Sequence, residues 1–412
     1  MSRIDPVNRL PVYIPPIFQG AEQIHVKVIT GSGIVRYEIM KVGILTYHRA
    51  YNYGAYLQAC ALCNRLNEEA DFDAEIIDYR MEKEVLYYDV RRFPLRKKLG
   101  RLKNGTWFFD LKLCSSFEEA VNDPVMKRSK DSLVSDSISD FSDFVRGKYD
   151  AIIVGSDEIW KVNRFRGFPN AYWLPGELGC RKLSYAASAR VQFEESLPGE
   201  RYEQLQSAVR DFEYLGVRDQ FTFDEVKKAA DPQQVVELCC DPSFLYDFRL
   251  GQSRIMELLA DERRFDPQKK TVMVMLDDDH TAKQILKYAG KRYNLISVFH
   301  KHSGYINVPG LKPLEWLDLI DTVDLVVASF FHAVCFSIVR NRPFLAIGTR
   351  GKKSKITELL SADDLKKHYL EPEEVGADFA EMMEDYMHPV NFSSFVAEKR
   401  AAFGSFLSAL KH

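Results

Sequence analysis

Hydrophobic and polar positions alternate along residues 40–241 in a pattern that predicts strands followed by helices. The run KVGILTY (41–47) is apolar and β-branched, which is typical of a buried parallel strand. A polar loop follows, then AYLQACALCNRLNEEA (55–70) with helical periodicity, and then the strand-like AEIIDY (74–79). Strand, loop, helix and strand in this order predict the opening βαβ unit of a doubly wound domain.

The alternation continues to the end of the chain in two series. Before residue 241, further strands are expected in YDAIIVG, KLSYAASA, EYLGVRD and VVELCC. From about residue 270, the strands KKTVMVML, YNLISVFH, DLVVASF and PFLAIG are separated by helical segments with short connections. Regular alternation of this kind favours α/β architecture with parallel sheets, so we predict two Rossmann-like domains.

The pattern divides the chain into five predicted segments. They are an N-terminal extension (1–39), an N-terminal Rossmann-like domain (40–241), a linker (242–268), a C-terminal Rossmann-like domain (269–388) and a C-terminal amphipathic helix (389–412). Within the extension, ITGSGIVRYEI predicts a hairpin. The strand beginning at Met40 makes that residue an alternative start of the protein, with the preceding segment as an upstream extension.

Composition narrows the class of protein. Hydrophobic residues make up 46% and charged residues 28% of the chain, as in globular proteins. A formal net charge of −3 gives no general attraction for nucleic acid, so we expect no nucleic-acid partner and only local anion binding. No apolar run approaches the roughly 20 residues that span a bilayer, and the N-terminus lacks a secretory signal pattern. We therefore expect a cytoplasmic protein.

Cysteines and acidic runs predict neither disulfides nor a metal site. The cysteine count of seven is odd. Cys60 and Cys63 form a CxxC inside an apolar helical pattern with no second ligand pair, so we interpret them as buried thiols. The acidic run LDDDH (276–280) is interpreted as a turn at a strand end. We expect no metal and no cofactor.

One stretch, residues 83–109, departs from the average in charge. It contains Arg91, Arg92, Arg96, Lys97, Lys98 and Arg101, followed by the aromatic residues Trp107, Phe108 and Phe109. Basic and aromatic residues together are typical of a peripheral contact with the inner face of a membrane. The alternative is a solvated loop or helix face, which we favour because basic runs are usually exposed surface.

Candidate chemistry lies where strands end. In open α/β sheets, ligands bind beyond the carboxyl ends of the strands, beside helix N-termini that favour anions. Three strand ends carry polar clusters: Asn52 and Gly54, Ser156 and Asp157, and Ser329 and His332. His332 is the most informative because it begins a helix at a strand end, where an imidazole can act as acid or base. The alternative is a histidine that caps or packs the helix.

Cations near further strand ends fit a multiply charged anion. Arg350, Lys352, Lys353 and Lys355 precede a predicted helix, and Arg190 and Arg218 end other strands. Each is weak evidence alone, since surface arginine and lysine are common. Together they supply the charge that a ligand with a phosphate and a carboxylate requires.

Taken in order, these segments resemble the polysaccharide pyruvyl transferase family. The matching runs are NYGAYLQACAL (52–62), VGSDEIW (154–160), SYAASA (184–189), GVRD (216–219), DPSFL (241–245) and ASFFHAVCFSIVRNRPFLAI (328–347). No single run is decisive, but the ordered set is specific.

The resemblance implies a fold like the GT-B glycosyltransferases, with the site in the cleft between two Rossmann-like domains. It implies phosphoenolpyruvate as donor and a carbohydrate acceptor, commonly lipid-linked, in exopolysaccharide or cell-surface polysaccharide synthesis. His332 matches the family's active-site histidine and would be the acid/base. Arg218 and Lys355 are the best matches for donor-binding cations. Asn52, Gly54 and Asp157 would shape the cleft.

The sequence departs from the family pattern at two positions. Some pyruvyl transferases carry an arginine two residues before the histidine, where this chain has Phe330. Another cation would then have to hold the donor, and Arg190 or the pair Lys352 and Lys353 are the candidates. Glu158 stands where glutamine is usual.

Two other functions remain open at this stage. A glycosyltransferase that uses a nucleotide sugar would need an acidic residue for the ribose in the second domain, and Glu315 is the nearest candidate. A non-catalytic carbohydrate-binding relative is the other, with Phe330 as its best support and His332 against it.

Overall fold

The computed structural model describes residues 26–30, 33–37, 39–163, 165–348 and 353–412. The chain forms two compact units, Met1–Ile39 and Met40–His412. In the first unit, β1 (Val26–Thr30) pairs antiparallel with β2 (Gly33–Tyr37), so the predicted hairpin is present. Everything that follows concerns the second unit.

The first half of this unit is built on a six-stranded sheet in which every strand pairing is parallel. Its order is β10-β9-β8-β7-β3-β4. The strands are β3 (Met40–Leu45), β4 (Phe72–Ile76), β7 (Ala151–Val154), β8 (Arg181–Ala187), β9 (Tyr214–Val217) and β10 (Val236–Leu238). The chain begins at β3, moves to the edge strand β4 and returns on the other side at β7. This reversal places a ligand-binding crevice beyond the carboxyl ends of β3 and β7.

The second half repeats this plan. Its sheet has the order β13-β12-β11-β14-β15-β16 and is also parallel throughout. The strands are β11 (Thr271–Met275), β12 (Asn294–Ser297), β13 (Ile306–Asn307), β14 (Leu325–Ala328), β15 (Phe344–Ile347) and β16 (Tyr369–Leu370). The reversal lies between β11 and β14, so a second crevice is expected where His332 follows β14. The predicted α/β class with parallel sheets is confirmed.

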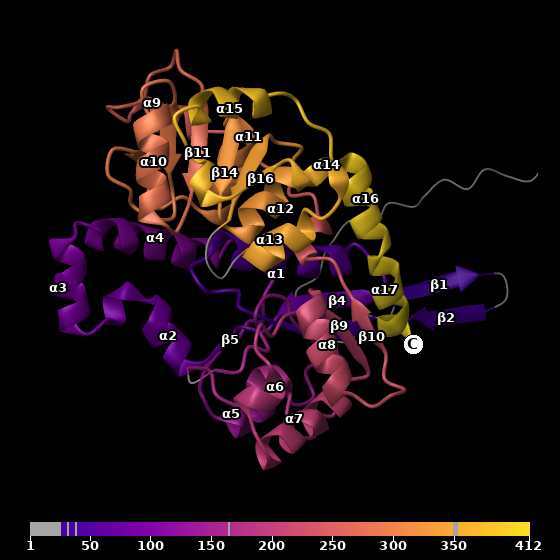
Figure 1. Cartoon of the computed structure of the whole chain (residues 1–412). Helices are drawn as coiled ribbons and strands as arrows, with labels where there is room; N and C mark the ends of the chain where they lie inside the picture. Colours follow the sequence, from indigo (N-terminus) through magenta and orange to yellow (C-terminus); the bar gives the residue numbers. More distant parts are fainter. Residues whose placement is uncertain (1–25, 31–32, 38, 164, 349–352) are drawn as a thin grey trace, which may run out of the picture. The chain divides into compact units, whose positions relative to one another are not determined.

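Helices cover these sheets, which is why the central strands are apolar on both faces (Figure 1). The first half contains α1 (Tyr53–Asn67), α2 (Glu82–Tyr88), α3 (Leu95–Lys103), α4 (Trp107–Ala120), α5 (Ile138–Val145), α6 (Phe193–Ser196), α7 (Glu200–Arg210) and α8 (Gln220–Ala229). The rest of the chain contains α9 (Ile255–Ala260), α10 (Asp279–Ala289), α11 (Pro313–Thr322), α12 (Phe331–Val339), α13 (Lys353–Leu359), α14 (Asp363–Lys366), α15 (Phe379–Tyr386), α16 (Ser393–Ala401) and α17 (Phe403–Lys411). No described helix is long and apolar enough to cross a membrane.

Short elements complete the unit. A two-stranded parallel sheet pairs β5 (Tyr79–Arg80) with β6 (Leu133–Val134). Single 3₁₀ turns are η1 (Val90–Arg92), η2 (Ala171–Trp173), η3 (Pro242–Phe244) and η4 (Pro372–Glu374). The turn η3 and helix α9 lie within residues 242–268, the predicted linker.

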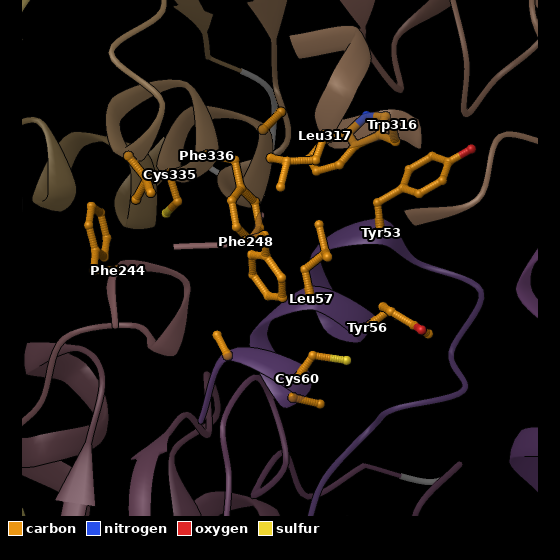
Figure 2. Packing of buried hydrophobic residues seen from close by; sticks show 14 of the residues in the cluster. Tyr53, Tyr56, Leu57, Cys60, Phe244, Phe248, Trp316, Leu317, Cys335 and Phe336 are labelled. Atoms are coloured by element: carbon orange, nitrogen blue, oxygen red, sulfur yellow. The ribbon is translucent and has the colours of Figure 1, made fainter. Parts of the chain in front are cut away.

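A continuous apolar core joins the two halves through α1 (Figure 2). The ring of Tyr53 stacks on Trp316 of α11, with centroids 5.1 Å apart, and Leu57 and Phe336 of α12 are fully buried in the same cluster. Burying a side chain of this size contributes about 2 kcal/mol. Because α1 is buried on nearly all sides, its residues 54 and 58 are held firmly beside α12.

The C-terminal part of the chain differs from the prediction, whereas the basic stretch agrees with the favoured exposed helix face. The C-terminal segment is not one helix but two, α16 and α17, which meet at Ala402. After this interruption, Phe403 and Phe406 pack on Tyr185 of the first sheet, with ring centroids 5.2 and 4.7 Å from that of Tyr185. The basic stretch within residues 83–109 is largely helical, and α3 buries none of its residues.

Candidate active site

A cleft of about 960 Å³ opens where the carboxyl ends of strands from both sheets meet. Its wall contains six of the residues singled out from the sequence: Asn52, Asp157, Arg190, Arg218, His332 and Lys355. Gly54, Ser156 and Ser329 do not line it, and Lys352 lies outside the described residues. The strand-end reasoning therefore brings residues from both halves of the unit to one cavity.

His332 is held against α1 from the second residue of α12. Its Nε2 lies 3.0 Å from Oε1 of Gln58 and 3.6 Å from Oδ2 of the buried Asp241. Two oxygens facing Nε2 favour a hydrogen on that nitrogen. Nδ1 has no hydrogen-bond partner among the described residues, which leaves it to exchange a proton. His332 does not cap its helix, since the N-cap position belongs to Phe330.

Gly54 allows this close approach of the imidazole. A Cβ atom at position 54 would lie 2.1 Å from Cγ and 2.2 Å from Nδ1 of His332. Any other residue would therefore push the imidazole away from α1. Gly54, predicted to shape the cleft, thus does so by making room for the histidine of the site.

An inner ion cluster lies behind His332 and consists of Arg218, Asp157 and Asp241. Nη1 of Arg218 donates to Oδ2 of Asp241 at 2.8 Å, and Nη2 donates to Oδ1 of Asp157 at 3.2 Å. The side chains of Arg218 and Asp241 are 4% and 1% exposed. Burial alone would raise the pKa of Asp241, but His332 and Arg218 hold it well below its usual range. Arg218 is thus a fixed, neutralised cation.

An outer ion cluster lies nearer the solvent and consists of Glu158, Arg190, Lys355 and Lys161. Oε1 of Glu158 accepts from Nη1 of Arg190 at 3.0 Å and from Nζ of Lys355 at 3.1 Å. Its Oε2 accepts from Lys161 at 3.0 Å. Although burial opposes it, these cations hold the pKa of Glu158 well below its ordinary value. One carboxylate oxygen therefore sits where two cations converge.

Lys355 is the titrating member of the outer cluster. Burial, followed by repulsion from Arg218, lowers the pKa of its ammonium to about 8, although Glu158 and Asp157 act in the opposite direction. Its charge is therefore present at neutral pH and is lost as the pH rises through about 8.

Three of the six described non-glycine residues with positive φ line the same cleft. Tyr51, Asp157 and Arg190 have φ values of 45°, 70° and 58°, in the left-handed region that side chains with a Cβ rarely adopt. Such conformations each cost of the order of 1 kcal/mol or more and occur mainly at functional sites. All three residues line the cleft.

Phe330 is part of an aromatic wall of the cleft. Its ring lies 5.2 Å from that of Phe299 and 5.8 Å from that of His300, and all three residues line the cleft. Arg166 lines it too, with its guanidinium 4.3 Å from the Tyr47 ring. His300 and Arg166 follow no recognisable motif and were not predicted as site residues.

Other predicted polar residues have structural partners. The Asn52 side chain caps α1 by accepting from the Ala55 N–H at 3.1 Å, and Ser329 donates to Asp277 at 3.0 Å. Ser156 is buried below the cleft, and its hydroxyl has no hydrogen-bond partner among the described residues. Glu315, considered for a ribose, accepts from the Lys312 N–H and caps α11.

The cysteines and acidic run behave as ordinary structural features. Cys60 and Cys63 are buried free thiols on α1, as predicted, and burial raises the pKa of Cys63 to about 12. Asp278 of the acidic run caps α10. Among the described residues, no three or more histidine, cysteine and acidic side chains are grouped to hold a metal ion.

Comparisons with known proteins give one family and one fold. A family model described as polysaccharide pyruvyl transferase matches residues 52–351. A search of curated proteins finds no match. The UDP-GlcNAc 2-epimerase of Neisseria meningitidis bound to UDP-GlcNAc is 10% identical, with a TM-score of 0.51 over 90% of this chain and 99% of that one.

A second solved structure, titled as the S. aureus MnaA–UDP co-structure, is 10% identical, with a TM-score of 0.50 over 91% of this chain and 98% of that one. At this identity the likeness concerns the fold alone. The predicted GT-B type of architecture is confirmed.

Proposed function

The chain belongs to the polysaccharide pyruvyl transferase family, and we propose that it transfers pyruvate from phosphoenolpyruvate to two hydroxyls of a glycan, forming a ketal. The convergence of Arg190 and Lys355 on one carboxylate oxygen, inside the cleft that contains His332, carries this proposal. A site that gathers cations around an anionic oxygen beside an acid/base suits a small anionic donor.

The donor binds, in this proposal, by exchanging places with the Glu158 carboxylate. An oxygen of phosphoenolpyruvate takes the position of Glu158 Oε1 between Arg190 and Lys355. These two cations supply the charge that an arginine at position 330 provides in some relatives. Arg218 is paired with Asp157 and Asp241, so in this proposal it holds these two carboxylates in place and leaves the donor to Arg190 and Lys355.

One histidine accounts for every proton in the transfer. Protonated His332 gives a proton to C3 of the donor, which leaves an oxocarbenium-like C2. The first hydroxyl attacks C2 and returns a proton to the imidazole, which then protonates the departing phosphate. The second hydroxyl attacks the regenerated cation at C2 and gives its proton to His332. The products are the ketal and hydrogen phosphate, and the imidazolium is restored.

The surroundings of His332 suit this cycle. Asp241 lies 3.6 Å from Nε2 of the imidazole, and Gln58 orients the ring through the same nitrogen. Nδ1 then carries the moving proton. We propose that the reaction takes place in the cytoplasm, because a multiply charged donor does not cross a bilayer unaided, and that the product is an exopolysaccharide or other cell-surface polysaccharide.

The test is turnover by the purified full chain. Phosphoenolpyruvate and lipid-linked glycans are incubated with wild type and with His332→Ala, and the product mass and released phosphate are measured. We expect a pyruvate ketal with one phosphate per transfer, and at least a 10²-fold loss in the variant. Wild-type turnover by a folded His332→Ala protein would remove the assigned role.

Ligand stabilisation distinguishes the alternatives. A ligand raises the melting temperature only of a protein that binds it. We expect phosphoenolpyruvate to raise the Tm of the wild type while nucleotide sugars leave it unchanged. The reverse result would identify a nucleotide-sugar glycosyltransferase, and binding of glycan alone would identify a non-catalytic relative.

A further inference from the structure

Helix α3 is amphipathic, yet none of its residues is buried. Leu95, Leu99 and Leu102 are 72%, 56% and 45% exposed. At about 100° per residue they fall within an arc of about 60° and form one apolar face. Phe108, at the start of α4, is 73% exposed as well. A face of this kind on a well-formed helix lacks a partner within the described chain.

Cations surround the leucine face. Between Val90 and Phe109 the chain has seven basic residues and no acidic one: Arg91, Arg92, Arg96, Lys97, Lys98, Arg101 and Lys103. On the helix, Arg96 and Lys103 flank the leucines on one side and Lys98 on the other. These three have no carboxylate partner among the described residues, whereas Arg91, Arg92 and Arg101 pair with aspartates. The charge available to a partner is therefore positive and lies beside the leucines.

The opposite face of α3 belongs to the candidate active site. Lys97, Gly100, Arg101 and Asn104 line the cleft, and their mean direction on the helix is opposite to that of the leucines. Figure 1 shows α3 at the margin of the unit beside α2 and α4. One short helix thus forms part of the cleft wall and also presents leucines and lysines to the solvent.

We propose that α3 docks on an anionic lipid surface, with its leucines in the headgroup region and Arg96, Lys98 and Lys103 on the lipid phosphates. Exposed leucines flanked by cations are what an interfacial helix needs. A second copy fits less well, because a two-fold contact would place each basic helix against its own equivalent. Nucleic acid would engage the cations but leave the leucines in water.

Docking in this way gives the acceptor an orientation. The cleft wall formed by α3 lies on the other side of the helix from the lipid, about one helix diameter away. A glycan carried on a lipid anchor would enter the cleft from the surface on which the enzyme sits. This consequence rests on the proposed transfer to a glycan, while the docking itself does not.

The docking is tested by flotation of the full-length protein with vesicles. One set contains phosphatidylcholine alone and the other contains phosphatidylcholine with phosphatidylglycerol. We expect wild type to float with the anionic vesicles, and Leu95→Ser/Leu99→Ser/Leu102→Ser to lower the partition coefficient at least tenfold. Arg96→Glu/Lys98→Glu/Lys103→Glu should lower it as much, and 1 M salt should weaken wild-type binding, since the Debye length there is about 3 Å.

Matched controls use exposed residues elsewhere. Met256→Ser/Leu258→Ser removes apolar side chains that are 50% and 41% exposed on α9, and Lys283→Glu/Lys287→Glu/Lys291→Glu reverses three exposed charges around α10. Both should float like wild type, and all variants should keep the wild-type Tm. Equal loss in the controls, or equal wild-type binding to neutral vesicles, would overturn the proposal. So would wild-type dimers that the leucine variant dissociates, without any vesicle binding.

A second readout separates this proposal from the proposed transfer. With a lipid-linked acceptor in anionic vesicles, the leucine variant should turn over at least fivefold more slowly. With a water-soluble acceptor fragment it should match wild type. Absence of transfer to any acceptor would refute the proposed function, and flotation would still decide the docking.

Discussion

The inner and outer ion clusters contain similar groups and differ in how firmly they are held. Arg218 and Asp241 of the inner cluster are almost completely buried and have well-defined partners. Glu158, Arg190, Lys161 and Lys355 of the outer cluster are between 11% and 34% exposed and share one carboxylate. A buried pair cannot lose a partner without leaving an uncompensated charge, whereas a partly exposed one can exchange it for a ligand. The inner cluster therefore fixes position, and the outer cluster is suited to binding.

The most severe test of this contrast is Gly54→Ala. The added methyl would displace the His332 ring from the position next to the inner cluster. We expect kcat to fall about 10³-fold, within the range that acid–base catalysis supplies, while the KM for phosphoenolpyruvate changes less than threefold. Gly404→Ala, on a helix where a Cβ meets nothing within 4 Å, should keep full activity. A fall in donor affinity without a fall in kcat would contradict the assignment of positioning to the inner cluster and of donor binding to the outer cluster.

Asp241→Asn breaks the inner cluster directly. It replaces one of the two carboxylates that face the buried Arg218 guanidinium with a neutral amide, which should lower the free energy of unfolding by about 3 kcal/mol in urea melts. The control is Asp247→Asn, which breaks the exposed pair with Arg400 and should cost less than about 1 kcal/mol. Equal losses of unfolding free energy in the two variants would show that the buried pair contributes no more to stability than the exposed pair.

Glu158→Gln weakens the outer cluster without removing its shape. Arg190 and Lys355 would lose their shared carboxylate and bind the donor more readily, so the KM for phosphoenolpyruvate should fall about tenfold, or about 1.4 kcal/mol. The unfolding free energy should change by less than about 1 kcal/mol. Glu213→Gln, which breaks the exposed pair with Arg181, is the matched control. A rise in KM would show that Glu158 orders the cations for the donor instead of competing with it.

The smallest expected effect is the pH dependence of donor binding. The pKa of Lys355 is lowered to about 8, so its charge is present below that pH and is lost above it. The KM for phosphoenolpyruvate should stay level up to about pH 8 and then rise by at most tenfold per pH unit. Lys355→Arg, which stays charged, should remove the rise. A profile that is identical in both proteins would exclude Lys355 as the titrating group.

The fold was largely predictable because the strands can be recognised from their local sequence. Parallel strands covered on both faces are continuous apolar runs, and segments such as AIIV (151–154) lie almost where the sequence places them. The C-terminal helix was predicted as one because its amphipathic pattern continues through Ala402. Its interruption lies next to the packing of Phe403 on Tyr185, a contact that no local pattern encodes.

The site was predictable in its location but not in its pairings. Strand ends pointed to His332, Arg218 and Lys355, and the cleft brings them together. Gln58 and Asp241 were missed as its partners because they lie 274 and 91 residues away along the chain. Glu158 was noticed only as a departure from the family pattern. Lys161 is its neighbour in sequence, but Arg190 and Lys355 come from distant segments that only the folded chain brings to it.

The connection through α16 and α17 has a mechanical consequence. The polypeptide passes between the halves of the unit twice, once through residues 242–268 and once through α16 as it leads into α17 on the first sheet. Together with the apolar core around α1, these two crossings resist any movement that would widen the cleft. Arg181 secures the far end of the second crossing by donating to the carbonyls of Ala409 and Leu410.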